Sequence, residues 1–286
     1  MKRNILLLFT FFACITVQGQ TPVRLVDLRS EHLDRPIGLD NPVPRLSWRM
    51  EDGRQGAVQT SWRIVVDEDS LNVVNGCGRM WDSGKNDSRN QLVAYAGKKL
   101  QPFTRYYWQV ICSDMEYKET ASPVSYFETG MMGMQHWQVA WIGDGKDIHY
   151  GPAPYFRKEF KTGKKVKSAR AYIAAAGLYE LYINGEKIGD HCLAPLYTRF
   201  DRRNLYVAYD VTSQLQNGDN AIGVLLGNGW YNHQSKAVWT LRRAPWRNRP
   251  AFCLDLRITY TDGSVETIPT DLSWRTASGA ITFNSI

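Results

Sequence analysis

The sequence predicts an all-β protein made of two consecutive β-sandwiches, and three observations support this fold class. No apolar stretch keeps a helical period for long, and short alternating runs are instead separated by turn residues. The chain has 286 residues, more than one domain usually contains. A Gly- and Met-rich segment at 130–134, which we expect to be a flexible joint, separates two series of such runs. We therefore place the sandwiches at 22–130 and 137–279.

The first 19 residues have the composition of a secretory signal peptide. Lys2 and Arg3 form a basic start, an apolar run spans 5–17, and small residues precede a cleavage point after Gly19. The apolar run is too short for a stable membrane anchor. We expect a periplasmic or secreted protein without a transmembrane span, cleaved near Gly19. Lipidation at Cys14 and a buried N-terminal helix are the two alternatives.

The first sandwich is predicted from strand-like runs that end in turn signals. In the run 100–112, a proline makes the corner and the alternate residues from Tyr106 to Cys112 share one face. We expect Trp48 and Trp108 to belong to the core, with a role as sugar platforms as the alternative. The predicted strands lie at 46–50, 61–66, 80–84, 100–112 and 125–129. A Pro-x-Thr-x-Tyr-x-Trp-x-Val strand late in the domain, from Pro102 to Val110, resembles fibronectin type III modules, which are immunoglobulin-like.

The second sandwich is predicted in the same way. Asn184-Gly185 lies between alternating apolar residues, the pattern of a two-residue hairpin with a type I′ turn. Asp210 is expected to cap a turn before Leu215. The predicted strands lie at 153–160, 167–173, 177–183, 220–227 and 254–260, with a last hairpin at 261–264. The apolar tail at 280–286 reads as the start of a further, truncated domain.

The charges and cysteines exclude some functions. The formal net charge of +7 is modest for this length and does not indicate a nucleic-acid partner. Four arginines between 242 and 249 predict a solvated loop, with an anionic partner as the alternative. No CxxC pair indicates zinc. Bridges Cys77–Cys112 and Cys192–Cys253 are conceivable, but buried thiols are the favoured interpretation.

The second sandwich contains an ordered set of motifs. They are Ala153-Pro154-x-Phe156-Arg157-Lys158-x-Phe160, Gly177-x-Tyr179-Glu180-x-Tyr182-Ile183-Asn184-Gly185, Leu193-Ala194-Pro195-x-x-Thr198 with Tyr206, Tyr209-Asp210-Val211-Thr212 and Gly227-Asn228-Gly229-Trp230-Tyr231. Together they resemble the N-terminal part of bacterial α-L-rhamnosidases of glycoside hydrolase family 78. Pro44-Arg45-Leu46-Ser47-Trp48 and Phe127-Glu128-Thr129-Gly130 also fit the leading fibronectin-like module of that family. The resemblance covers nearly all of the chain after the signal peptide.

The resemblance implies a fold and a reaction. The second sandwich is similar to the galactose-binding-like jelly-roll module of the family, which in some members binds rhamnose through calcium. The family cleaves terminal α-L-rhamnose from glycans and glycosides with inversion, using two carboxylates on a downstream (α/α)6 barrel. No carboxylate pair here matches a family catalytic motif, so we assign no catalytic residue. The expected partners are rhamnose-containing glycans or glycosides and the downstream catalytic domain of the same protein.

The loop 228–232 is the candidate sugar site. Sugars need an aromatic face and fixed polar groups, and calcium needs several hard oxygens. Trp230 and Tyr231 supply the rings, and Asn228, Asn232 and Asn184 supply amides that orient sugar hydroxyls or hold calcium. Glu180 and Asp144 are further candidates. The alternative is that the two rings belong to the core and Asn228 is a turn residue.

Two functions from different classes stay open on the sequence alone. The first is the non-catalytic portion of a rhamnosidase that scaffolds the enzyme and binds sugar. The second is a structural or adhesion pair of sandwiches without sugar affinity. A third possibility is that the two sandwiches are accessory modules of a different glycosidase.

Overall fold

The computed structural model describes residues 22–236 and 238–284, and it divides into two compact units. Among the described residues, the first unit comprises 22–34, 43–98 and 106–126. The second comprises 35–42, 99–105 and the residues from Phe127 onward. The expected signal peptide at 1–19 and the alternative lipid site at Cys14 lie outside the described residues.

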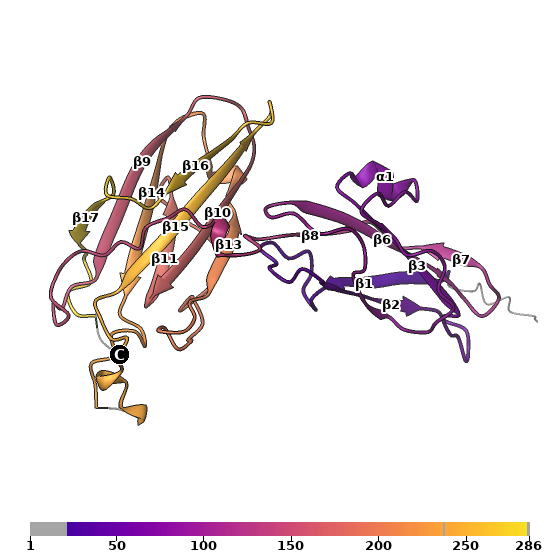
Figure 1. Ribbon diagram of the computed structural model, residues 1–286, viewed down its shortest axis with the longest axis horizontal. Coiled ribbons are helices and arrows are strands. Elements are labelled where there is room, and N and C mark those ends of the chain that lie inside the picture. The colour runs from indigo at the N-terminus through magenta and orange to yellow at the C-terminus, as the bar shows by residue number, and fades with distance from the viewer. Residues whose placement is uncertain (1–21, 237, 285–286) are drawn as a thin grey trace, which may run out of the picture. The chain divides into compact units, whose positions relative to one another are not determined.

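The first unit is a sandwich of two antiparallel sheets (Figure 1). One sheet has the order β1-β2-β5, and the other has the order β4-β3-β6-β7, with β8 pairing to β6. The elements are β1 (Arg24–Ser30), β2 (Arg45–Glu51), β3 (Ser61–Asp67), α1 (Ser70–Val74), β4 (Trp81–Asp82), β5 (Leu92–Ala94), β6 (Arg105–Ser113), β7 (Glu119–Ala121) and β8 (Ser125–Glu128). Arg105 of β6 and the last two residues of β8, Phe127 and Glu128, belong to the second unit.

Trp48 and Trp108 lie in the core of this sandwich, as the sequence predicts. Trp108 is fully buried and Trp48 nearly so. The Trp48 indole N–H donates to Oε1 of the buried Gln59 at 2.9 Å. Along β6 the residues from Tyr106 to Cys112 alternate between buried and half-buried, so one face of the strand packs inward. Neither Trp48 nor Trp108 is therefore a surface platform for sugars.

The second unit contains the jelly-roll sandwich (Figure 1). Its two sheets have the orders β13-β10-β15-β16 and β12-β11-β14-β9-β17. The strands are β9 (Pro154–Thr162), β10 (Val166–Ala176), β11 (Leu178–Ile183), β12 (Glu186–Lys187), β13 (Tyr206–Asp210), β14 (Gly218–Gly227), β15 (Ala251–Tyr260), β16 (Val265–Pro269) and β17 (Arg275–Ser278). The 3-10 helices are η1 (Met134–His136), η2 (Thr212–Gln214) and η3 (Val238–Arg243).

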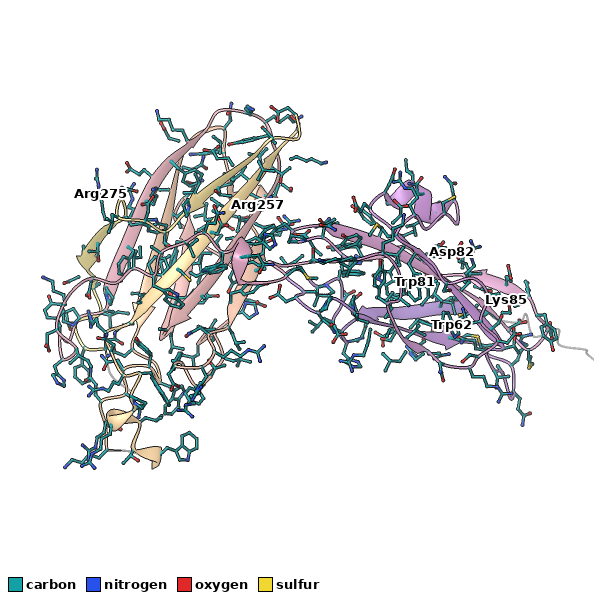
Figure 2. The ribbon with its side chains drawn as sticks, viewed as in Figure 1. Trp62, Trp81, Asp82, Lys85, Arg257 and Arg275 are labelled. Atoms are coloured by element: carbon teal, nitrogen blue, oxygen red, sulfur yellow. The ribbon has the colours of Figure 1, made fainter. Side chains whose placement is uncertain are left out.

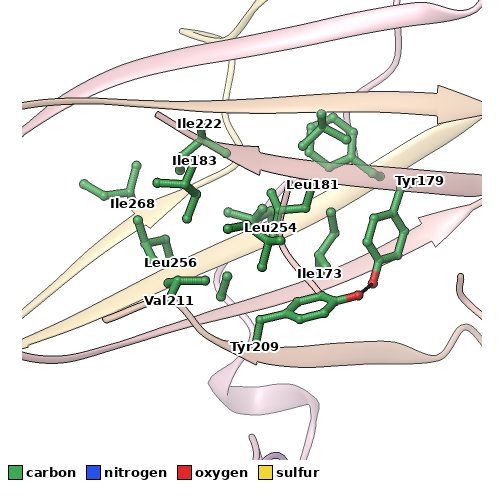
Figure 3. Close-up of a cluster of buried hydrophobic side chains, with 14 of the residues drawn as sticks. Ile173, Tyr179, Leu181, Ile183, Tyr209, Val211, Ile222, Leu254, Leu256 and Ile268 are labelled. Atoms are coloured by element: carbon green, nitrogen blue, oxygen red, sulfur yellow. Dashed lines mark hydrogen bonds between the residues drawn. The ribbon is translucent and has the colours of Figure 1, made fainter. Parts of the chain in front are cut away.

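The core of the second sandwich lies between these two sheets (Figure 3). Strands β9 and β14 bury every second residue, so one side of each strand faces the core. Strand β10 is buried on both of its sides from Ala169 to Ala176. Two tyrosines meet in the core, where the hydroxyls of Tyr179 and Tyr209 are 3.0 Å apart (Figure 3). Pairing satisfies both buried hydroxyls.

The turn between β11 and β12 has the predicted geometry. Asn184 has a φ of 52° and Gly185 a φ of 87°. Two successive residues with positive φ define the type I′ turn, which matches the twist of a two-residue hairpin. Asp210 also acts as predicted, because its Oδ1 accepts the backbone N–H of Thr212 at 3.1 Å and closes the turn before Leu215.

Hydrogen bonds anchor part of the segment 130–134, where we expected a flexible joint. Met131 is buried, and its backbone N–H donates to the Tyr206 hydroxyl at 3.3 Å. The backbone N–H of Met132 donates to Oδ1 of Asp40 at 2.8 Å. Glycine and methionine composition indicated mobility here, but hydrogen bonds and burial hold the backbone of Met131 and Met132 within the second unit.

The four described cysteines are free thiols, so neither conceivable disulfide forms. Cys112 and Cys253 are buried as expected, whereas Cys77 and Cys192 are exposed. The prediction of buried thiols was therefore wrong for the two cysteines that lie outside strands. Among the described residues, no helix is long and apolar enough to cross a membrane.

Candidate functional site

The loops of the second sandwich gather at its two ends, and we call the end with the long loops the loop end (Figure 1). The antiparallel pairing places Gly227, Ala176 and Ala251 at this end. The loop end therefore carries the four segments 141–153, 188–205, 228–250 and 279–284. The opposite end carries the tight turns at 163–165, 184–185, 211–217 and 261–264, and we call it the hairpin end.

The two asparagines of the candidate loop are buried at the loop end and are engaged in structural hydrogen bonds. Each is 1% exposed. The Asn228 amide donates to the carbonyl oxygen of Asn284, and its Oδ1 accepts the Asn232 amide at 3.2 Å. The Asn232 amide also donates to the carbonyl of Ile148 at 2.9 Å, and its Oδ1 accepts Nε of Arg247 at 3.0 Å. Asn228 and Asn232 therefore tie three loop-end segments together and do not offer their side chains to a ligand.

Residues 281–284, expected to belong to a further domain, are bound to this end of the second sandwich. Oδ1 of Asn284 accepts the backbone N–H of Asn228 at 2.9 Å. The backbone N–H of Asn284 donates to the carbonyl of Gly151 at 3.1 Å, and that of Ala153 donates to the carbonyl of Ile281 at 2.9 Å. These three bonds fix the tail against the loops at 141–153 and 228–250.

The rings of Trp230 and Tyr231 are half-buried and belong to a larger group of aromatic side chains. Trp230 stacks on His233 with ring centroids 5.4 Å apart and planes 6° apart. Tyr231 meets Phe200 edge to face at 5.2 Å. We call the following set the aromatic cluster: Tyr197, Phe200, Trp230, Tyr231, His233, Trp239 and Trp246.

Trp239 is the most exposed ring of the aromatic cluster. It is 74% exposed and lies 6.3 Å from Trp230, centroid to centroid. Its φ of 68° is rare for a bulky residue, and such backbone strain concentrates at functional sites. Tyr197 also contacts Trp230, with ring centroids 6.4 Å apart, and is 44% exposed. The cluster therefore presents aromatic surface to solvent, although its members come from two loops far apart in the sequence.

Four polar side-chain atoms in the loop-end segments have no hydrogen-bond partner among the described residues. They are His233 Nδ1, Arg242 Nε, Trp246 Nε1 and Asn284 Nδ2, and all four are buried. Buried polar atoms are normally paired with protein, water or ligand. Half of the eight such side-chain atoms in the described chain therefore lie at the loop end.

The structure does not bring Asn184 to this site. Asn184 lies at the hairpin end, where its amide donates to the carbonyl of Gln214 at 2.8 Å and to Oδ1 of Asn220 at 2.9 Å. Ile183 pairs with Ile222 and Leu178 with Gly227, so most of the length of β14 separates Asn184 from Asn228. Asn184 stabilises its own turn, because its Oδ1 accepts the backbone N–H of Ala221 at 2.9 Å.

The three asparagines therefore do not fit the expected calcium site. Their side-chain oxygens already accept N–H groups, and Asn184 is remote from the other two. Calcium prefers six to eight oxygen ligands with carboxylates among them. The two acidic candidates do not complete the set: Asp144 pairs with Arg249 at 2.7 Å and Glu180 pairs with Lys187. The described residues also contain no group of three His, Cys, Asp or Glu side chains suited to a metal.

The arginines between 242 and 249 do not form the solvated loop that we expected. Arg249 is 7% exposed, and its guanidinium also donates to the carbonyls of Tyr150 at 2.8 Å and Pro152 at 2.6 Å. Arg247 holds Asn232. Of these arginines only Arg243 is exposed. Arg249 and Arg247 therefore act as internal braces of the loop end.

Two family descriptions match the chain in consecutive regions. Residues 25–133 match the Rha78A-like N-terminal immunoglobulin domain, and residues 164–286 match the α-L-rhamnosidase N-terminal domain. These regions correspond to the first and second sandwiches described above.

Similar proteins cover nearly the whole chain. An α-L-rhamnosidase of Formosa agariphila is 30% identical over 99% of this chain and 33% of its own length. One from an Alteromonas species is 30% identical over 87% of this chain and 28% of its own length. The solved α-L-rhamnosidase from Dictyoglumus thermophilum has a TM-score of 0.84 and 37% identity over 92% of this chain and 30% of its own.

The chain spans about a third of the length of the curated relatives that it matches. The relatives are α-L-rhamnosidases, and both matched family domains are N-terminal domains. The chain therefore belongs to the α-L-rhamnosidase family as its N-terminal portion, an immunoglobulin-like domain followed by the α-L-rhamnosidase N-terminal domain.

Proposed function

We propose that this chain is the non-catalytic portion of an α-L-rhamnosidase that hydrolyses terminal α-L-rhamnose from glycans or glycosides. The family matches to two N-terminal domains, together with relatives about three times as long, support this assignment. An inverting glycosidase needs two carboxylates on either side of the scissile bond, and we assign that pair to a separate catalytic domain. The protein acts outside the cytoplasm, in the periplasm or after secretion, because of the signal-like sequence at 1–19.

We further propose that the loop end of the second sandwich contacts the sugar. The observation that carries this proposal is the aromatic cluster, in which Trp230, Trp239 and Tyr197 leave ring surface exposed beside buried, unpaired polar atoms. An aromatic face accommodates the C–H surface of a sugar ring. In this proposal Asn228 and Asn232 hold the loop in place through their hydrogen bonds to other loop-end segments and do not contact the ligand.

Titration calorimetry with L-rhamnose tests the sugar contact. A monosaccharide makes few net favourable contacts, so we expect a dissociation constant of about 1 mM. Trp239→Ala should abolish detectable binding and leave the circular dichroism spectrum unchanged. Tyr117→Ala, which removes an aromatic side chain 75% exposed in the first unit, is the matched control. Wild-type affinity in Trp239→Ala would contradict the proposal, and no binding by the wild type would favour a purely structural role.

A chelator tests whether sugar binding needs calcium, and an aryl rhamnoside tests whether the chain hydrolyses rhamnosides. EDTA should leave rhamnose binding unchanged, because the asparagines of the loop are already hydrogen-bonded to protein. Loss of binding in EDTA, restored by calcium, would contradict this expectation. The purified chain should release no nitrophenol from p-nitrophenyl α-L-rhamnoside above a mock preparation. Turnover above that level would overturn the assignment of catalysis to a separate domain.

A further inference from the structure

The outward side of the five-stranded sheet of the second sandwich carries an ordered row of side chains, separate from the loop end. Strand register places Tyr182 of β11 opposite Gly223 of β14, Gly223 opposite Arg157 of β9, and Arg157 opposite Arg275 of β17. Directly paired residues lie on the same side of a sheet. Tyr155 lies two residues before Arg157 on β9 and is therefore on the same side of the sheet. The rings of Tyr155 and Tyr182 and the guanidinium groups of Arg157 and Arg275 can therefore converge here.

Gly223 makes this surface hollow. The side chains around it border a groove of about 650 Å³, whose lining includes Tyr155, Tyr182, Arg157 and Arg275. A glycine within a strand interior often marks a place where a ligand or another chain approaches closely. The volume lies within the range of small-ligand sites. Gly223 therefore lies in the floor of the groove, and tyrosine and arginine side chains form its walls.

The chemistry of the walls favours a sugar over a purely apolar ligand. Tyr155 is 38% exposed and Tyr182 is half-buried. The Tyr182 hydroxyl donates to Oε2 of Glu180 at 2.7 Å. Aromatic side chains beside fixed polar groups match the alternating C–H and hydroxyl surface of a pyranose ring.

The charged side chains on this side of the sheet favour a sugar that carries a negative charge. Three cations are each paired with a neighbouring carboxylate, namely Arg157 with Glu159, Lys161 with Asp219 and Lys187 with Glu180. Arg275 has no ion-pair partner among residues 22–236 and 238–284. Its side chain extends from β17 at the edge of the sandwich (Figure 2). A guanidinium group without an ion-pair partner, next to aromatic rings, is suited to bind a ligand carboxylate through two hydrogen bonds.

We propose that this groove, which we call the sheet groove, binds an acidic oligosaccharide whose uronate carboxylate pairs with Arg275 while its rings lie on Tyr155 and Tyr182. Such a site holds an acidic part of a glycan and is independent of the aromatic cluster at the loop end. Its failure or success therefore leaves the proposed contact with rhamnose untouched.

Substitution of Gly223 by valine tests the groove without disturbing the fold. A Cβ at Gly223 would lie 3.7 Å from the Cβ of Tyr182 and 3.9 Å from the Phe156 carbonyl oxygen, which are ordinary contacts. Valine also favours strands. Gly223→Val should therefore fill the floor of the groove and keep the protein folded. Gly163→Ala, at a glycine with open space around it, is the matched control.

The probe is tetragalacturonate, compared with its neutral methyl ester by titration calorimetry on the whole chain. The wild type and Gly163→Ala should bind the acid, and the ester should bind at least about tenfold more weakly, because a charged hydrogen bond is lost. Gly223→Val should abolish binding. Arg275→Gln and Tyr155→Ala should each weaken binding about tenfold, whereas Arg243→Gln at the loop end should not.

Three results would overturn the proposal. The first is that the wild type does not bind tetragalacturonate. The second is equal affinity for the acid and its ester, which would remove the role of Arg275. The third is full affinity in Gly223→Val together with lost affinity in Trp239→Ala, which would place the ligand at the loop end.

Discussion

The outward sides of the two sheets in the second sandwich differ in what covers them. On the four-stranded sheet, Tyr172 of β10 is 1% exposed and Arg170 is 8% exposed. On the five-stranded sheet, Tyr155 and Arg157 of β9 are exposed. We call the first side the covered face and the second the open face. Both faces carry tyrosine and arginine on long antiparallel strands, so residue type alone does not decide which face is available to a ligand.

The covered face is closed by segments that belong to the same compact unit. The Phe103 ring packs on Tyr172 at 5.4 Å and lies 4.4 Å from the Arg257 guanidinium, which Figure 2 labels. Glu128 accepts two hydrogen bonds from Arg170, at 2.6 and 3.0 Å. On this face charges serve to hold segments in place, whereas the open face retains the unpaired Arg275.

The largest expected difference between the faces concerns their tyrosines. Tyr172→Ala should destabilise the second unit by about 3–5 kcal/mol, because it empties a fully packed site. Tyr155→Ala should cost less than about 1 kcal/mol, because the ring is partly in solvent. Urea unfolding followed by circular dichroism measures both variants. Equal losses would show that the two faces are packed alike and would break the comparison.

Ion pairs on the two faces should differ next most strongly. Glu128→Ala leaves the buried Arg170 with the half-exposed Asp210 as its one carboxylate partner among the described residues, and we expect a loss of about 3 kcal/mol. Glu159→Ala breaks the exposed pair with Arg157 and should cost less than about 0.5 kcal/mol. Thermal unfolding of each variant against the wild type gives the two values. A small effect of Glu128→Ala would mean that water reaches Arg170.

A buried carboxyl on the covered face should make stability depend on pH. Burial raises the pKa of Asp255 to about 6, although the nearby Arg257 counteracts part of this shift. Between about pH 4 and 6 the folded protein holds this proton and the unfolded chain has lost it, so stability falls as pH rises. Above pH 6 the loss is complete.

Asp255→Asn sharpens this point, because the amide carries no charge to desolvate. The variant should be more stable than the wild type by about 2 kcal/mol at pH 7, since two pKa units correspond to about 2.7 kcal/mol. The difference should shrink towards pH 4. Urea titrations at the two pH values test it, and a difference independent of pH would show that Asp255 does not titrate as described.

The smallest expected effect is a gain on the open face. Glycine in a strand interior costs about 0.5–1 kcal/mol relative to alanine, because its unfolded backbone has more freedom. Gly223→Val should therefore raise the unfolding midpoint slightly, and differential scanning calorimetry can detect the shift. A clear loss of stability would mean that Gly223 is required by the backbone and not only by the groove.

The sequence anticipated the elements governed by local rules. Alternating apolar residues located β9, β11 and β14, and Asn184-Gly185 identified its turn correctly because that turn depends on two adjacent φ angles. The roles of Asn228 and Asn232 were not readable, since their partners Asn284, Ile148 and Arg247 lie elsewhere in the chain. An asparagine amide can bind a ligand or hold two loops together, and the sequence around Asn228 and Asn232 does not distinguish these roles.

The two candidate surfaces were hidden for a similar reason. Trp230 marked the aromatic cluster, but Tyr197 and Phe200 join it from a loop about 30 residues earlier. At the sheet groove, Gly223 within an apolar strand was the available signal. Its neighbours Tyr182, Arg157 and Arg275 come from three other strands, so only the register reveals the row.

Hydroxyl-radical footprinting of the chain with and without tetragalacturonate tests most directly whether the open face is the binding face. We predict that the ligand protects Tyr155 and Tyr182 from oxidation and leaves Trp239 unchanged. Tyr172 should stay unreactive in both states, because it is buried on the covered face. Protection confined to Trp239, or no protection at either tyrosine of the sheet groove, would contradict this account.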